Sequence, residues 1–282
     1  MKSILIATDF SLAASNAASY GIELAKAFNV TAVLFNACDE SPQALTAAPS
    51  PLSPQEAMDY LQEQLKEDAR LLATLHSWPV LTCCRSGSTL HAIREAISEF
   101  SADLVLAGMK EKGKAIRRVL GSTITSLIGN VETPILIIPE KFKFTYITKI
   151  ALAAHKDIPE NTQLDLPGVL QKLKERFHSK LYMVYVAKSP GLNGTTRLLK
   201  LPFDINWHVQ HPDLDIEEIT GKNIPRSLTT FVRSYDIQIL CIFQHKNSIF
   251  RSFPFKNQSR ILAFDCPIPL LLLPLPLIDA AP

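Results

Sequence analysis

The chain has 282 residues, of which 47% are hydrophobic and 20% charged, and its formal net charge is +2. This composition predicts a soluble globular protein, not a disordered or fibrous one, and the length suits one large domain or two of average size. The near-neutral charge favours neither a nucleic-acid face nor a strongly anionic partner. Five scattered cysteines without CxxC spacing favour a reducing compartment over a disulfide framework.

The sequence predicts no membrane attachment. The first residues run straight into a strand pattern, without a charged-then-apolar leader. The most apolar stretch, 267–277, is interrupted by prolines and is shorter than the ~20 residues that a membrane-spanning helix needs. We therefore expect a cytoplasmic protein with no membrane partner.

In the first half, apolar runs alternate with helical periodicities. The expected strands are 3–8, 31–37, 80–84, 103–108 and 134–139. Ser11 is placed to cap the first helix, and Ser53 begins a capping box whose helix should run to about His76. Further helices are expected around Leu90 and after residue 123. Such alternation predicts a parallel, doubly wound sheet.

The second half repeats this order. Two pairs of residues, each 133 positions apart, mark the same places in both halves: Asp103 with Asp236, and Pro134 with Pro267. The first strands of the halves, at Ile4 and Ile150, are 146 positions apart, so the second copy should have lost a net 13 residues upstream. A repeat of this size is a duplicated domain and not a solenoid unit, whose period is about 20–50 residues.

We therefore predict two domains, 1–142 and 143–282, joined near 141–146. Each should have an α/β fold with a doubly wound, mainly parallel five-stranded sheet. Both halves end in a continuously apolar strand flanked by prolines, PILIIP in the first and PIPLLLLP in the second. Pairing of these two strands would cover edges that otherwise expose unpaired backbone groups.

Several motifs together resemble the universal stress protein family, over the whole chain as two copies. They are ATDFS at 7–11, Arg85-Ser86-Gly87 before the third helix, a fourth strand ending at Gly108 with a loop to Gly121-Ser122, and TPILIIP at 133–139. The resemblance implies an adenine-nucleotide α-hydrolase-like fold and a role in stress response. It also implies an internal pseudo-dimer through the terminal strands, and it is compatible with a further homodimer.

The resemblance implies an ATP site along the carboxyl edge of the sheet, where ligands of open α/β sheets bind at the topological switch point. Mg²⁺ would enter this site only with ATP. The residues that the resemblance places there are Asp9 at the nucleoside, Ala37 facing adenine with its main chain, and Gly108, Gly121, Ser122 and Thr123 at the phosphates. Glycine lets backbone N–H groups approach phosphate oxygens, and a helix N-terminus supplies further donors.

The first copy departs from the family pattern at one position. Glu111 stands where the pattern has its middle glycine, and it brings negative charge towards a triphosphate, whereas Lys110, Lys112 or Lys114 could add positive charge. Asp9 is equally compatible with an Asx-type turn or a helix cap. Residues 121–123 are equally compatible with an ordinary helix start.

In the second copy the site should be lost. An offset of 133 replaces the site residues as follows: Gly108 by Cys241, Gly121 by Pro254, Ser122 by Phe255 and Thr123 by Lys256. Proline has no N–H group to donate to a phosphate. The strand alignment places His155 at the Asp9 position. We therefore predict a degenerate second domain that keeps only the fold.

Other chemistry has less support in the sequence. The basic run 110–118 lacks aromatic residues and is typical of a solvated loop, so no nucleic acid is expected. His208 and His211 lack further ligands at zinc spacing, so we expect no metal site. Cys83 and Cys84 should point to opposite faces of a strand.

Two functions follow from these patterns. The first is a stress-response regulatory protein that binds ATP in its first domain, with no catalytic residues and at most weak ATPase activity, because no general base or nucleophile elbow is evident. The alternative is a scaffold or interaction protein that binds no nucleotide, which Glu111 and the eroded second copy favour.

Overall fold

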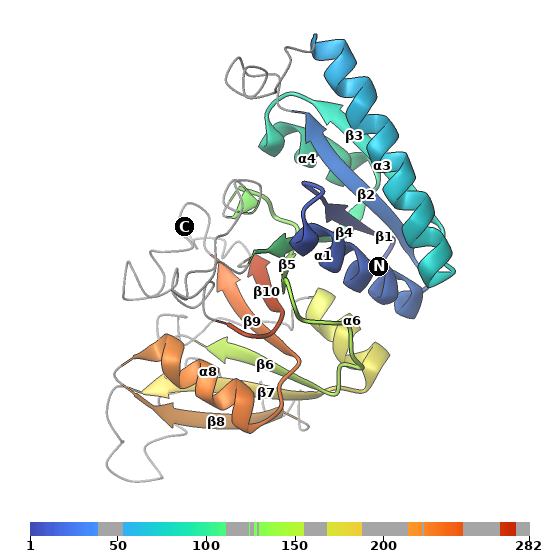
Figure 1. The fold of residues 1–282 in the computed structure, drawn as a ribbon. Helices are drawn as coiled ribbons and strands as arrows, with labels where there is room; N and C mark the ends of the chain where they lie inside the picture. Colours follow the sequence, from blue (N-terminus) through green and yellow to red (C-terminus); the bar gives the residue numbers. More distant parts are fainter. Residues whose placement is uncertain are drawn as a thin grey trace, which may run out of the picture. The chain divides into compact units, whose positions relative to one another are not determined.

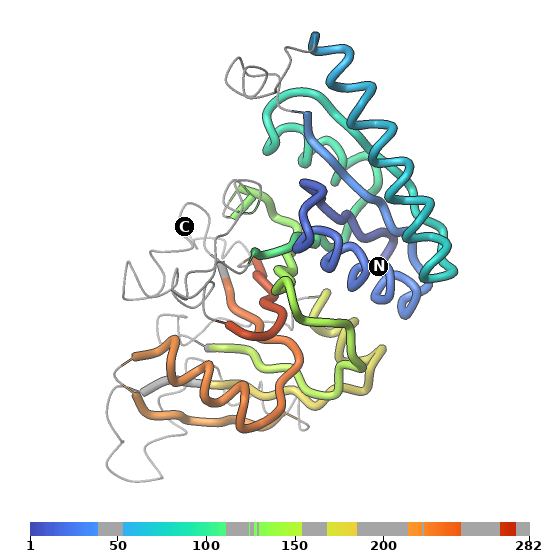
Figure 2. The backbone as a smooth tube through the Cα atoms, in the orientation of Figure 1, coloured from blue at the N-terminus to red at the C-terminus, as the bar shows by residue number. Residues whose placement is uncertain are grey.

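The computed structural model describes residues 1–38, 53–110, 124, 127–128, 130–154, 168–187, 214–221, 223–244 and 266–274. The chain divides into two compact units, Met1–Phe144 and Thr145–Pro282 (Figures 1 and 2).

The first unit contains a five-stranded parallel sheet in the order β3–β2–β1–β4–β5. Its strands are β1 (Ser3–Ala7), β2 (Thr31–Cys38), β3 (Val80–Ser86), β4 (Ala102–Met109) and β5 (Ile135–Pro139). Its described helices are α1 (Leu12–Phe28), α3 (Pro54–His76) and α4 (Thr89–Glu99). The order runs outward in one direction from β1 to β3 and in the other from β4 to β5, so the topological switch point lies between β1 and β4.

The helices of this unit begin where the sequence predicts. Ser11 is the N-cap of α1, and its side chain accepts a hydrogen bond from the Ala14 N–H at 3.3 Å. Ser53 and Glu56 form the predicted capping box of α3, with proline at the first helical position. Left-handed residues end both helices, Asn29 at φ 55° and Ser77 at φ 50°.

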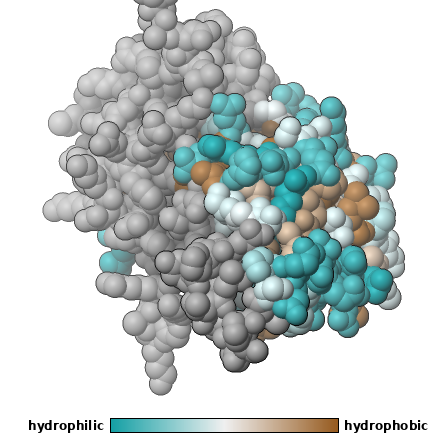
Figure 3. Space-filling view, turned by 90° about the horizontal axis from the view of Figure 1, so that it is seen from above, coloured by the Kyte–Doolittle hydropathy of each residue, from teal (hydrophilic) through white to brown (hydrophobic). Residues whose placement is uncertain are grey.

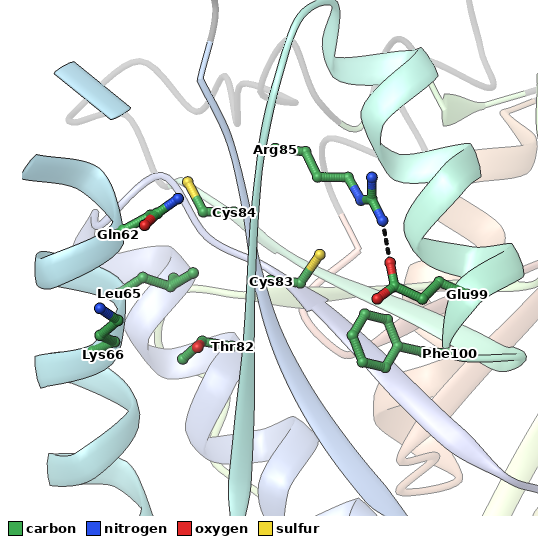
Figure 4. A pocket seen from close by; sticks show the side chains of 9 residues that line it. All are labelled: Gln62, Leu65, Lys66, Thr82, Cys83, Cys84, Arg85, Glu99 and Phe100. Carbon is green, nitrogen blue, oxygen red and sulfur yellow. Dashed lines mark hydrogen bonds and ion pairs between the residues drawn. The ribbon is translucent and has the colours of Figure 1, made fainter. Parts of the chain in front are cut away.

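The core of the first unit forms between the sheet and the helices on its two faces. All five residues of β1 are buried, because helices cover both sides of this central strand. Figure 4 shows the edge strand β3 with α3 on one side and α4 on the other. The outer surface mixes hydrophilic and hydrophobic areas on the face seen in Figure 3.

The second unit repeats this architecture, with the sheet order β10–β9–β6–β7–β8 and parallel pairing. Its strands are β6 (Lys149–Ala154), β7 (Lys180–Ala187), β8 (Leu214–Thr220), β9 (Ile239–Gln244) and β10 (Leu270–Pro274). Its described helices are α6 (Gly168–Phe177) and α8 (Ile224–Ser234). The predicted α/β class with two mainly parallel five-stranded sheets is confirmed, whereas the internal pseudo-dimer stays a prediction.

The repeat offset predicted for the later part of each unit is wrong by two residues. Helices α4 and α8 each have 11 residues and start 135 positions apart, at Thr89 and Ile224. Equivalent hydrogen bonds have the same offset, because Val105 N–H donates to Pro134 O and Leu240 N–H donates to Pro269 O. With 146 at the first strands, the second copy is 11 residues shorter upstream, not 13.

The error comes from two coincidences of residue type. The last strand of the second unit has two prolines before it, Pro267 and Pro269, and the second is the structural match to Pro134. Asp236 has φ 53° after its helix, and the residue in that place in the first unit is Ser101, with φ 48°. The true counterparts of Asp103 and Pro134 therefore both lie two residues later than predicted. For this reason the stretch between them still has the same length in both copies.

Candidate functional site

A tight turn joins the carboxyl end of β1 to the N-terminus of α1, beside the switch point. Phe10 has the left-handed φ of 59°, and its N–H donates to the Thr8 hydroxyl at 3.0 Å. The Asp9 Oδ1 atom accepts hydrogen bonds from the Ser11 N–H at 3.1 Å and from the Ser11 hydroxyl at 2.5 Å. Asp9 therefore forms the Asx-type turn that the sequence allowed.

The second oxygen of Asp9 faces the end of β4. Asp9 Oδ2 accepts a hydrogen bond from Lys110 Nζ at 2.8 Å, and the two side chains are 55% and 50% exposed. Partial burial by itself would raise the pKa of the Asp9 carboxyl, but the hydrogen bonds from Lys110 and Ser11 outweigh burial and hold this pKa below its ordinary value. The carboxylate is therefore ionised at neutral pH.

Gly108 lies at the end of β4, directly under the first turn of α1. A Cβ atom at this position would lie 2.2 Å from Ala13 O and 2.7 Å from Ala14 N, far inside contact distance. Because both are backbone atoms, no rotamer change would relieve the clash. Gly108 is thus required for α1 to sit on the sheet, an explanation that needs no phosphate.

The end of β2 lies on the other side of β1 from β4. Ala37, the predicted adenine-facing position, pairs in register with Arg85 of β3. Its neighbour Asn36 is buried and donates its Nδ2 to Thr8 O at 2.8 Å. The Oδ1 atom of Asn36 has no hydrogen-bond partner among the described residues. Sequence reasoning missed Asn36, although an amide in the apolar run of β2 was a signal.

A second buried amide, that of Asn16, holds α1 against the end of β5. Asn16 Nδ2 donates to Pro139 O at 3.1 Å and to Phe142 O at 2.9 Å, while its Oδ1 accepts from Lys143 Nζ at 2.9 Å. These bonds tie the helix to the end of β5 and to the segment after it. Asn16, which no sequence motif marks, thus helps to position the N-terminus of α1.

The structure brings together part of the predicted site. Asp9 and Gly108 lie at the switch point, and Ala37 lies at the end of the neighbouring strand β2. The other predicted positions fall outside the described residues: Gly121, Ser122, Thr123 and Glu111 in the first unit, and His155, His208, His211, Pro254, Phe255 and Lys256 in the second.

The predicted counterpart of Gly108 in the second unit is corrected by the offset of 135. Gly108 corresponds to Phe243, not to Cys241, which takes the fully buried place of Leu106 inside the strand. A phenyl group thus stands where the first unit has a hydrogen atom. The first turn of a helix cannot approach the sheet there as Ala13 approaches Gly108.

A groove of about 430 Å³ lies at the edge strand β3, away from the switch point (Figure 4). Cys83 and Cys84 point to opposite sides of β3, as predicted. Burial, and to a lesser extent the electrostatic effect of Cys38 and Cys83, raises the pKa of the Cys84 thiol to about 11. Arg85, the first residue of the Arg-Ser-Gly motif, forms ion pairs with Glu95 at 3.2 Å and with Glu99, both on α4. These contacts give β3 a structural role and supply no nucleophile.

Other chemistry finds no support in the part of the chain that the structure describes. No group of three or more His, Cys, Asp or Glu side chains there could hold a metal ion. None of the five cysteines is in a disulfide bond. No helix within the described ranges has the length and hydrophobicity needed to cross a membrane.

Together, the two parallel sheets and the helices packed on them define an α/β protein with two doubly wound units. The model of the family described as "Universal stress protein family" matches residues 1–139. The chain belongs to the universal stress protein family. No curated protein matches it by sequence.

Solved structures extend the fold to both units. A universal stress protein from Archaeoglobus fulgidus DSM 4304 matches with a TM-score of 0.71 and 9% identity, over 96% of this chain and 98% of that chain. A functionally unknown protein from Pseudomonas aeruginosa PAO1 matches with a TM-score of 0.58 and 13% identity, over 97% and 92%. The first match spans nearly all of both chains, so this chain is a tandem member with two units of the fold.

One half-length match is a universal stress protein in complex with cAMP. Its TM-score is 0.35 and its identity 17%, over 49% of this chain and 96% of that chain. At this score the match carries no inference about a ligand of this chain.

Proposed function

We propose that the first unit binds an adenine nucleotide at the carboxyl edge of its sheet, and that the chain acts in stress response as a regulatory protein without efficient turnover. One observation carries the proposal: Asp9 and Gly108 flank the switch point between β1 and β4, beside the N-terminus of α1. Open α/β sheets bind ligands at this place.

The residues around this point fit the nucleoside part of such a ligand. Asp9 is an ionised, half-exposed carboxylate that suits hydroxyl donors. The unpartnered Oδ1 of Asn36 is a buried acceptor next to Ala37, and an exocyclic amine would satisfy it. Gly121, Ser122 and Thr123 remain the proposed phosphate contacts, and Mg²⁺ is proposed only as the counterion of ATP.

A scaffold without a nucleotide is the second candidate. The observation that favours it is Phe243, which occupies the place of Gly108 in the second unit. If Glu111 repels phosphates in the first unit, both units would act through protein contacts alone. In either case we propose a cytoplasmic location, and pairing of the apolar strands β5 and β10 stays a prediction.

Calorimetric titration with Mg-ATP tests the proposal. The wild-type chain should bind, and Asp9→Ala should weaken binding by about tenfold, in line with the loss of one hydrogen bond to a charged group. The matched control is Asp59→Ala, because Asp59 is exposed on α3 and bonds only within that helix in the described structure, to Gln55. Absence of binding at millimolar nucleotide, with the protein folded, would favour the scaffold.

A further inference from the structure

Both oxygens of the Asp9 carboxylate are already engaged within the protein. Oδ1 accepts two hydrogen bonds from Ser11, and Oδ2 accepts one from Lys110 Nζ at 2.8 Å. The two bonds from Ser11 belong to the turn that starts α1, so they are fixed by the fold. The bond from Lys110 comes from a long, half-exposed side chain beyond the end of β4, so it is the bond that a ligand can exchange.

The free energy needed to replace the bond between Lys110 and Asp9 depends on the charge of the ligand. A ligand hydroxyl that takes the place of Lys110 at Asp9 leaves the ammonium group without its anion. An uncharged nucleoside has no anionic group to pair with the Lys110 ammonium group. A nucleotide has one, because its phosphate can replace Asp9 as the partner of Lys110. The net charge of the pair is zero, so only an anionic ligand leaves each charged group with a partner.

We propose that Lys110 makes this site selective for nucleotides over uncharged nucleosides, because its ion pair closes Asp9 to a neutral ligand and a ligand phosphate replaces Asp9 as its partner. This inference rests on the proposed function. It assigns to Lys110 a specificity role that the glycine pattern does not contain. Specificity then comes from the cost imposed on the wrong ligand as well as from a contact to the right one.

The expected effect is moderate. Solvent and salt screen an ion pair whose members are both about half exposed, so opening it should cost a neutral ligand no more than a factor of about five. The contact between Lys110 and phosphate should contribute a similar factor to a nucleotide. The ratio of the two affinities should therefore fall by about fivefold to about 25-fold when the lysine charge is removed.

The test compares ATP, AMP and adenosine in the full chain at low salt, with adenosine also measured as a competitor of bound ATP. Lys110→Gln should weaken ATP by about fivefold and leave adenosine equal or up to about fivefold tighter. Lys110→Arg should keep the wild-type ratio, because it keeps the charge. Lys66→Gln is the matched control, because Lys66 is an exposed lysine on α3 that pairs with Glu63.

The outcomes separate this inference from the function on which it rests. If ATP binds and the ratio of ATP to adenosine affinity is the same in wild type, Lys110→Gln and Lys66→Gln, the inference is overturned while the proposed function stands. If neither ATP nor AMP binds to the folded wild-type chain, the proposed function fails, and the inference fails with it. A lower ratio in Lys110→Gln alone supports it.

Discussion

The amino-terminal edges of the two sheets are alike, whereas their carboxyl edges differ. At the amino-terminal edge, a side chain at the start of the fourth strand caps the backbone ahead of the first strand in both units. Asp103 Oδ2 accepts from Lys2 N–H at 2.5 Å, and Gln238 Oε1 accepts from Thr148 N–H at 3.0 Å. The second strand also starts alike, with Thr31 N–H donating to Lys2 O and Lys180 N–H donating to Thr148 O.

At the carboxyl edge the same positions carry different residues. Gly108 admits the first turn of α1 in the first unit, and Phe243 is the corresponding residue in the second. The contacts at the amino-terminal edge are thus kept in both copies, whereas the residues at the carboxyl edge have diverged. This division is expected of open α/β sheets, in which function depends on the loops at the strand C-termini.

The largest effect should come from placing a methyl group at the carboxyl edge of the first unit. Gly108→Ala should lower the free energy of unfolding by about 3 kcal/mol, because Ala13 and Ala14 of α1 must move away from the sheet. Denaturant titration measures this loss. Gly168→Ala is the control and should be neutral or slightly stabilising, because among the described residues no atom beyond its chain neighbours and its own helix backbone lies within 4 Å of the added Cβ. Equal stability of both variants would show that the clash is absent.

A smaller effect should appear at the shared amino-terminal edge. Gln238→Ala should cost about 2 kcal/mol, because the Gln238 carbonyl oxygen accepts bonds from the Thr148 N–H, the Thr148 hydroxyl and the Lys149 N–H. Gln238→Glu keeps the acceptor and should lose less than half as much. Thermal or urea unfolding distinguishes the two variants. If they were equally destabilised, the capping role of this side chain would be wrong.

The smallest effect should separate two helix starts that look equivalent in sequence. Ser11→Ala should cost about 1 kcal/mol, because the Ser11 hydroxyl caps α1. Ser88→Ala should cost little, because Ser88 is the N-cap of α4 but makes no side-chain capping bond. Unfolding of the two variants under identical conditions provides the comparison. A larger loss for Ser88 than for Ser11 would contradict it.

Local signals in the sequence predicted most of the fold. Ser11 and the Ser53 capping box marked helix starts because capping depends on residues three positions apart. The offset in the later part of the repeat was wrong by two residues, because Pro267 and Pro269 are equally good candidates until the strand pairing shows which carbonyl group Leu240 bonds.

The candidate site was predicted less completely for a related reason. Asp9 was found from its place at a strand end, but its pairing with Lys110 depends on β1 and β4 being neighbours across 101 positions of sequence. The clash that requires Gly108 is also invisible in sequence, because it involves backbone atoms of a helix that is distant along the chain. Such contacts depend on tertiary packing and on no local pattern.

The close packing of α1 on Gly108 has a consequence for the evolution of such sequences. In the first unit, where α1 packs against this position, selection for folding alone would retain the glycine after ligand binding is lost, although the second unit folds with Phe243 there. Counting motif glycines among descendants would then overestimate how many are still active. Retention of Lys110 would be the better record of a working site, because its exposed ion pair with Asp9 contributes little to stability, whereas Asp9 also forms the turn that starts α1.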